Sequence, residues 1–263
     1  MNRRGAVKRK KLGQHFLADA RVVERIVTAA RVGEGDRVLE IGPGEGFMTR
    51  RLLEAGALVY AIELDQRLAA ALSPLAERSG GRLTVERANA LYFDESKPGA
   101  PYHIVSNLPY SVATALITRF VALHGRVASM TVMIQEEVAR RVTAAPGDSN
   151  YGSLSVFVTY HADVEYLFTV PPEAFRPPPK VDSAVIRLIP RAARVEVDDE
   201  AEFFRFVAKA FSSRRKTLRN NVAKLCPSRE DFESAREAAG IPAEARAQEI
   251  SLAQFAALYA RRG

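Results

Sequence analysis

The sequence has no tryptophan, a single cysteine and only four histidines among its 263 residues. One cysteine, Cys226, excludes an internal disulfide and a cysteine-rich zinc site, and it favours a reducing compartment. The histidines are far apart and show no spacing typical of metal ligands; they are His15, His103, His124 and His161. We therefore expect no metal site.

Long apolar runs are also missing. No stretch approaches the roughly 18 apolar residues that a membrane-spanning helix needs, and the basic start is not followed by the apolar segment of a signal peptide. Hydrophobic residues nevertheless make up 47% of the chain, which is ample for a buried core. We expect a cytoplasmic protein with no membrane association.

Acidic residues are outnumbered, with 31 Asp and Glu against 38 Lys and Arg, which gives a net charge of +7. The basic excess is concentrated in the first eleven residues and in 212–224, and neither segment contains an acid. Such clusters suggest a polyanion as the partner, most simply nucleic acid. A solvated charged face with a disordered tail is the alternative explanation.

The spacing of apolar residues predicts strands that alternate with helices. Strands are expected at 37–41, 58–62, 83–87, 103–106 and 129–134, and helices at 20–30, 48–55, 66–76, 113–123 and 136–143. Strands separated by helices indicate a parallel α/β sheet. The segments 154–160 and 181–189 are rich in β-branched residues, so we expect them to form an antiparallel pair that closes the sheet.

Beyond residue 198 the pattern becomes wholly helical, with helices expected at 201–212, 218–225, 229–239 and 252–261. We therefore expect two domains joined by a linker near 190–197. The first spans residues 1–190 and the second spans residues 198–263.

A glycine-rich loop, 42–46, follows the first strand, where a doubly wound sheet binds an adenosine-containing ligand. Its glycines, Gly42 and Gly44 among them, permit a tight turn and a close approach of the ligand to the backbone. The third glycine of a dinucleotide fingerprint would stand at position 47, which is Phe47, and no P-loop sequence occurs. The spacing therefore disfavours NAD and a P-loop nucleotide.

Two polar residues follow the next strands. Glu63 stands directly after the second strand, where a carboxylate can accept hydrogen bonds from both hydroxyls of a ribose. Asn89 follows the third strand and can hydrogen-bond an adenine edge through its amide, although a turn residue is an equally ready explanation for it.

The segment Asn107-Leu108-Pro109-Tyr110 follows the fourth strand. Pro109 favours an extended Leu108, whose carbonyl then points into the crevice, and the side-chain oxygen of Asn107 offers a second acceptor beside the Tyr110 ring. Two acceptors next to a stacking face suit a planar group with an exocyclic amine, such as adenine. Because Asn107 cannot be a strong base, the amine proton must leave late, and the acceptors stabilise the developing positive charge. A buried strand end with a core tyrosine is the alternative.

Six segments together resemble one family, the ribosomal RNA adenine dimethyltransferases of the KsgA/RsmA type. In chain order they are LGQHFL (12–17), EIGPG (40–44), IELD (62–65), NLPY (107–110), AFRPPPKVDSAV (174–185) and FSSRRKTLRNN (211–221). Any one of them alone is a weak signal, whereas the ordered set is highly specific.

The resemblance implies a Rossmann-like methyltransferase fold that uses S-adenosylmethionine and carries a small C-terminal helical domain for RNA recognition. It implies cofactor contacts at His15, Leu17, Gly42, Gly44, Glu63, Asn89 and Asn107. It implies that Asn107, Leu108, Pro109 and Tyr110 hold a flipped adenosine, with Phe175 packing on the same base. The implied product is N6,N6-dimethyladenosine at two adjacent adenosines in the 3′-terminal hairpin of small-subunit (16S) ribosomal RNA, within a pre-30S particle.

Two positions depart from the family's pattern. Asn89 stands where Asp is usual, and an amide supplies no charge, so the affinity for the cofactor is expected to differ. His15 stands where Asn is also common. The methyl-accepting residues match, so we still expect an active, monomeric enzyme.

We expect the two basic clusters to bind RNA phosphates. The residues expected to make these contacts are Arg9, Lys10, Lys11, Arg214, Arg215, Lys216 and Arg219. Two other functions remain open. One is methylation of large-subunit ribosomal RNA that confers antibiotic resistance, and the other is a non-catalytic RNA-binding assembly or transcription factor with the same fold.

Overall fold

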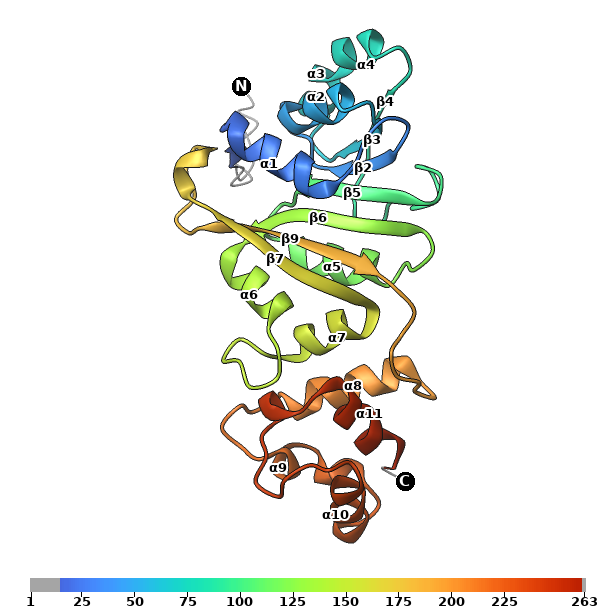
Figure 1. The fold of residues 1–263 in the computed structure, drawn as a ribbon, viewed down its shortest axis with the longest axis vertical. Helices are drawn as coiled ribbons and strands as arrows, with labels where there is room; N and C mark the ends of the chain where they lie inside the picture. Colours follow the sequence, from blue (N-terminus) through green and yellow to red (C-terminus); the bar gives the residue numbers. More distant parts are fainter. Residues whose placement is uncertain (1–14, 262–263) are drawn as a thin grey trace, which may run out of the picture.

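A seven-stranded sheet with strand order β4-β3-β2-β5-β6-β9-β7 forms the centre of the computed structural model, which describes residues 15–261 (Figure 1). Five strands are parallel: β2 (Arg37–Ile41), β3 (Leu58–Glu63), β4 (Leu83–Arg87), β5 (Tyr102–Asn107) and β6 (Val127–Gln135). The strand β9 (Ser183–Pro190) runs antiparallel to both of its neighbours, β6 and β7 (Ala162–Val170). The predicted Rossmann-like sheet is confirmed.

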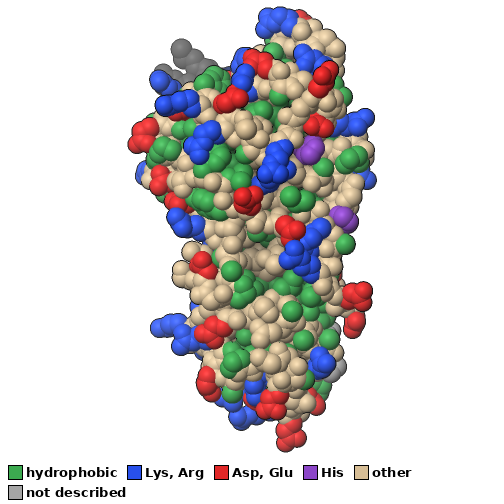
Figure 2. All heavy atoms as spheres, in the orientation of Figure 1, with side chains coloured by type: hydrophobic (Ala, Val, Ile, Leu, Met, Phe, Trp, Pro, Cys, Tyr) green, Lys and Arg blue, Asp and Glu red, His purple; other side chains and the backbone are tan. Residues whose placement is uncertain are grey.

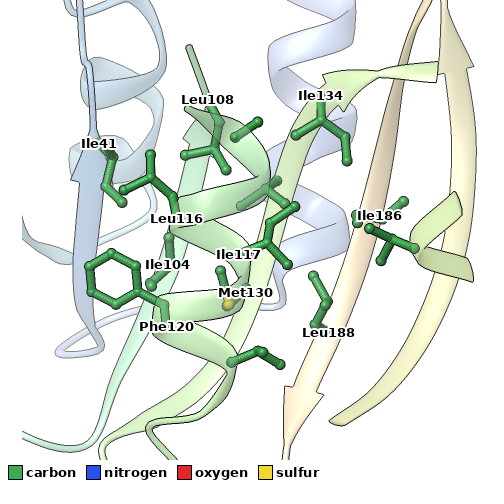
Figure 3. Packing of buried hydrophobic residues seen from close by; sticks show 14 of the residues in the cluster. Ile41, Ile104, Leu108, Leu116, Ile117, Phe120, Met130, Ile134, Ile186 and Leu188 are labelled. Carbon is green, nitrogen blue, oxygen red and sulfur yellow. The ribbon is translucent and has the colours of Figure 1, made fainter. Parts of the chain in front are cut away.

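Helices cover both faces of this sheet. One face packs against α1 (Ala20–Ala30), α2 (Phe47–Glu54), α3 (Gln66–Ala71) and α4 (Ser73–Arg78). The other face packs against α5 (Ala113–Val121), α6 (Glu136–Thr143) and α7 (Ser153–His161). In Figure 3, Leu116, Ile117 and Phe120 of α5 lie against strand residues such as Ile104 and Met130, and Leu108 belongs to the same cluster. The backbone of the NLPY segment is thus anchored in the core.

One element was predicted wrongly. The segment 154–160 forms the helix α7 and not a strand. The strand that pairs with β9 at the edge of the sheet is β7, which directly follows α7 in the chain. The sequence of α7 is apolar on all sides because the helix is buried on two. Leu154 and Val158 pack in the sheet cluster, whereas Val156 and Tyr160 pack against the C-terminal helices. Because both sides of the helix are buried, its sequence lacks the alternation of apolar and polar residues that marks a surface helix. Tertiary packing overrides the preference of its β-branched residues for a strand.

The C-terminal region contains α8 (Glu200–Ala210), α9 (Leu218–Val222), α10 (Arg229–Ala238) and α11 (Leu252–Ala260). Each begins at a side chain that accepts a hydrogen bond from the first turn: Asp199, Thr217, Ser228 and Ser251. These helices lie at the end of the molecule opposite α2–α4, with α6 and α7 between (Figure 1).

Residues of the two predicted domains pack together in one hydrophobic core. The core of the C-terminal helices includes Ala144, Tyr151, Val156 and Tyr160, which come from the first predicted domain. The side-chain hydroxyl of Tyr151 donates to the carbonyl of Ile250 at 3.0 Å. The division at 190–197 stays a prediction, and the shared core indicates that the two parts are tightly coupled. Among residues 15–261, no helix has both the length and the apolar character needed to cross a membrane.

Candidate active site

A cavity of about 560 Å³ opens at the carboxyl ends of β2, β3, β4 and β5. It is the place where an open α/β sheet binds its ligands. The sequence-predicted residues that line it are His15, Leu17, Gly42, Gly44, Glu63, Asn89, Asn107, Leu108, Pro109 and Tyr110. The fold therefore brings together ten of the eleven residues predicted for cofactor and adenosine.

The glycine loop after β2 forms one wall of the cavity. Gly44 has a φ of +57°, and a Cβ there would stand 3.0 Å from the Phe16 ring. Its backbone N–H donates to Oε2 of Glu63 at 3.2 Å. A side chain at this position would be strained and would push Phe16 away, so the loop needs glycine to lie this close to Glu63.

Glu63 is held rigidly at the end of β3. Its side chain is buried at 5% exposure, and its second oxygen, Oε1, accepts from the backbone N–H of Asp65 at 2.9 Å. Two backbone donors fix the carboxylate, and each oxygen keeps a lone pair for a ligand hydroxyl.

Glu40, a second buried carboxyl group at the cavity, was not predicted as a site residue. Burial is the main cause that raises the pKa of Glu40 to about 8; a hydrogen bond from the Thr49 hydroxyl at 2.7 Å opposes the shift, and the nearby Glu63 adds to it. Glu40 is therefore largely protonated at neutral pH. Its position inside the EIGPG segment was the available signal.

Asn89 lines the cavity two residues after the end of β4. Its side-chain Oδ1 accepts from the backbone N–H of Leu91 at 3.0 Å. The side chain is exposed, as a ligand contact requires.

The NLPY segment lines the cavity and contributes the two oxygens that were expected to act as acceptors. Oδ1 of Asn107 is buried and has no hydrogen-bond partner among the described residues. The N–H of Leu108 donates to the carbonyl of Met133 at 3.0 Å. The carbonyl of Leu108 itself receives no hydrogen bond from any residue in 15–261. A buried acceptor without a donor is unfavourable, and a bound amine would satisfy it.

Tyr110 is held by two segments that are distant in the sequence. Its hydroxyl shares a 2.7 Å hydrogen bond with Oγ of Ser183 at the start of β9. Its ring lies 6.2 Å from the His15 ring at an angle of 25°. Nδ1 of His15 in turn donates to the carbonyl of Pro177 at 2.7 Å. Burial raises the pKa of Tyr110, so the phenol is neutral. Ser183 was not predicted as a site residue; its position inside the AFRPPPKVDSAV segment was the available signal.

Phe175 is not brought to the cavity. It forms the short strand β8 (Phe175–Arg176), which pairs with β1 (Phe16–Leu17), and it is 2% exposed. Its ring packs in the apolar cluster that contains Val23 and Val185. The expectation that Phe175 packs on the target base does not match this arrangement, because apolar burial holds the ring in the core.

The predicted RNA-binding residues have different environments. Arg9, Lys10 and Lys11 lie outside the described residues. The Arg214 guanidinium donates to the carbonyls of Ser149 and Tyr151, both at 2.7 Å, so it joins two parts of the fold.

Arg219 lies 3.7 Å from a carboxylate oxygen of Glu233, whereas the exposed side chains of Arg215 and Lys216 make no hydrogen bond or ion pair within 15–261. On the face drawn in Figure 2, basic side chains are interspersed with acidic ones. No group of three or more potential metal ligands occurs in the described part of the chain.

The comparisons with known proteins agree with this geometry. The sequence pattern of the family described as "Ribosomal RNA adenine dimethylase" matches residues 5–261. "Ribosomal RNA small subunit methyltransferase A" of Alcanivorax borkumensis is 43% identical, over 95% of this chain and 88% of that protein. The protein of the same name from Caulobacter vibrioides is 44% identical, over 94% of both chains.

Two solved structures share the fold over almost the whole chain. A dimethyladenosine transferase from Plasmodium falciparum has a TM-score of 0.77 at 25% identity, covering 93% of this chain and 96% of its own. The 23S rRNA methyltransferase ErmE has a TM-score of 0.74 at 28% identity, covering 94% and 99%. Since the family pattern and these relatives span nearly all of its length, this chain belongs to the ribosomal RNA adenine dimethylase family.

Proposed function

We propose that this protein transfers methyl groups from S-adenosylmethionine to N6 of adenosine in small-subunit ribosomal RNA. The expected targets are two adjacent adenosines in the 3′-terminal hairpin, dimethylated during assembly of the subunit. The names of the relatives that are 42–44% identical support the choice of subunit. The observation that carries the chemistry is the unpartnered, buried Oδ1 of Asn107 beside the Tyr110 ring.

The residues around the cavity fit S-adenosylmethionine, which supplies an electrophilic methyl group on a sulfonium centre when it is bound. The Glu63 carboxylate would accept from the ribose hydroxyls, and the glycine loop leaves room for the ligand against the backbone. Asn89 would contact the adenine edge. The cavity thus offers an acceptor for the ribose hydroxyls and room for the ligand beside the backbone of the glycine loop, as an adenosyl group requires.

The acceptor side of the site prepares the target amine. Tyr110 offers a ring face to the extruded adenine, and its hydrogen bond with Ser183 limits rotation of that ring. Oδ1 of Asn107 and the carbonyl oxygen of Leu108 each accept a hydrogen bond from the target amine, and these two hydrogen bonds localise the lone pair of its nitrogen. As the nitrogen becomes cationic, these fixed oxygens stabilise its charge. Neither oxygen is a strong base, so the proton passes late to solvent.

A large-subunit target is the second candidate, favoured by the likeness to ErmE. Its identity of 28% is well below the 43% and 44% shared with the small-subunit enzymes. A non-catalytic RNA-binding protein has less support, because the acceptors and the carboxylate of the cavity are all in place. We further propose that the protein acts in the cytoplasm as a monomer on a pre-30S particle.

Methyl transfer to purified subunits tests the function. Labelled S-adenosylmethionine would be supplied with unmethylated small and large ribosomal subunits, and the label would be mapped on the RNA. We expect label on small-subunit adenosines as dimethyladenosine. Label confined to large-subunit RNA would support the second candidate, and cofactor binding without transfer would support the non-catalytic one.

A further inference from the structure

Asn89 lines the cavity where the cofactor is expected to bind, and one hydrogen bond shows which end of its side-chain amide faces the protein. Its Oδ1 accepts from the backbone N–H of Leu91 at 3.0 Å. Oxygen and nitrogen of an amide are easily exchanged in a structure, but only the oxygen can accept from a backbone N–H. The hydrogen bond therefore assigns the amide: the oxygen faces the turn, and Nδ2 is the end without a partner among residues 15–261.

Nδ2 is a donor with no lone pair to offer. Asn89 is exposed at the cavity, so this donor is available to a ligand. The edge of adenine that carries the C6 amine presents that amine, which is a donor, and the ring nitrogen N7, which is an acceptor. Two donors do not pair, so the free end of Asn89 matches N7 better than the amine.

We propose that Asn89 reads the cofactor's purine by donating from Nδ2 to N7, an acceptor in both adenine and its 6-oxo counterpart, and that it therefore selects only weakly for an amine over a carbonyl at C6. The proposal rests on the proposed function, because the cofactor is taken to carry an adenosyl group. A carboxylate at the same position would do the opposite, since it only accepts and would favour the amine while repelling a C6 oxygen. Position 89 thus determines how strictly the site recognises adenine.

Binding of two nucleosides tests this polarity without any turnover. The probes are S-adenosylhomocysteine and its 6-oxo counterpart, S-inosylhomocysteine, titrated calorimetrically into the full-length wild-type chain, Asn89→Ala and Asn89→Asp. The measured quantity is the ratio of the two affinities, adenosyl over inosyl. We expect the ratio to be lowest for the wild type, intermediate for Asn89→Ala and highest for Asn89→Asp, with a rise of about tenfold from wild type to Asp.

A matched control separates edge recognition from general affinity. Glu63→Gln weakens the ribose contact, so both nucleosides should lose affinity alike and the ratio should stay at the wild-type value. Because Asn89 is exposed, its variants are expected to fold, and circular dichroism with thermal unfolding checks this.

The possible outcomes are distinct. A wild-type ratio above that of Asn89→Ala would mean that Asn89 accepts from the amine, and the proposal would be wrong. A ratio that Glu63→Gln shifts as much as Asn89→Asp would also overturn it. If the wild type bound neither nucleoside, the proposed cofactor would be wrong and this inference with it, whereas tight adenosyl binding with the reversed order would overturn only the assigned polarity of Asn89.

Discussion

The hydrogen bond between Tyr110 and Ser183 gives the target site its most specific residue-level prediction. Ser183→Ala and Tyr110→Phe each remove one partner of a bond that is 2.7 Å long. Because a hydrogen bond of this kind contributes about 1 kcal/mol, each variant should lower kcat/KM for RNA methylation roughly fivefold. The double variant should be no worse than either single one, since both remove the same interaction.

The comparison is made by steady-state kinetics on an RNA substrate, together with thermal unfolding of all three variants. A purely structural role for Ser183 would lower the melting temperature and leave kcat/KM unchanged. Losses of kcat/KM that multiply in the double variant would show that the two residues act independently.

Glu40 predicts a pH dependence of stability. Its pKa of about 8 in the folded chain lies above the ordinary value of 4.5, so between these pH values the folded state holds a proton that the unfolded state releases. Stability from Glu40 is therefore present below about pH 4.5 and declines as the pH rises towards 8. Glu40→Gln keeps a neutral side chain at every pH.

We expect Glu40→Gln to melt at a higher temperature than the wild type at pH 8, with the difference shrinking towards pH 5. Differential scanning calorimetry of the ligand-free proteins at several pH values measures it. A difference of the same size at pH 5 and pH 8 would contradict the raised pKa.

Local sequence was sufficient to identify residues whose place follows from strand ends. Glu63 and Asn107 are the last residues of parallel strands and Asn89 follows one by two residues, and such positions meet at one edge of the sheet. Ser183 lies inside the segment 174–185 that resembles the family, but its contact with Tyr110 depends on the register of β9 against β6, which the sequence does not give. Phe175 illustrates the opposite problem, since its segment matched the family while its ring is in the core.

At the scale of elements, α7 shows where propensity fails. Its β-branched residues favour a strand in isolation, but the helix is buried between the sheet and the C-terminal helices. The regular elements β2 and β4 were predicted to the residue, because each shows strand-forming residues bounded by turn signals.

A pair of charge substitutions at the start of α7 tests its helical state. Ser153 is exposed and is the first residue of the helix, where the partial positive charge of the helix end favours an anion. Ser153→Asp should therefore be more stable to urea than Ser153→Lys, by ~0.5–1 kcal/mol at low salt. The difference should decrease at high salt because the site is exposed. Equal stabilities at low salt would contradict a helix beginning there.

At the scale of the whole molecule, Arg214 connects the C-terminal region to the loop that precedes α7. Its two hydrogen bonds to the carbonyls of Ser149 and Tyr151 lie beside the shared core of the two parts. Arg214→Ala should destabilise the chain by ~1–3 kcal/mol in urea unfolding.

Arg215→Ala is the matched control, because the Arg215 side chain is exposed and makes no hydrogen bond or ion pair within residues 15–261. Its stability should stay within about 0.5 kcal/mol of the wild type, while RNA affinity falls and the salt dependence of binding decreases by about one unit in slope. If Arg215→Ala were less stable than Arg214→Ala, Arg215 and not Arg214 would be the residue that joins the two parts, which would contradict this prediction.

The account as a whole depends on Asn107 presenting an acceptor to the target amine. The direct measurement is the single-turnover rate of methyl transfer to unmethylated small subunits by Asn107→Ala, with RNA affinity measured on the same preparation. We predict a rate lower by about 100-fold or more, since a fixed oxygen at the developing charge is lost, and RNA affinity close to that of the wild type. A rate that fell only in proportion to RNA affinity would contradict the account.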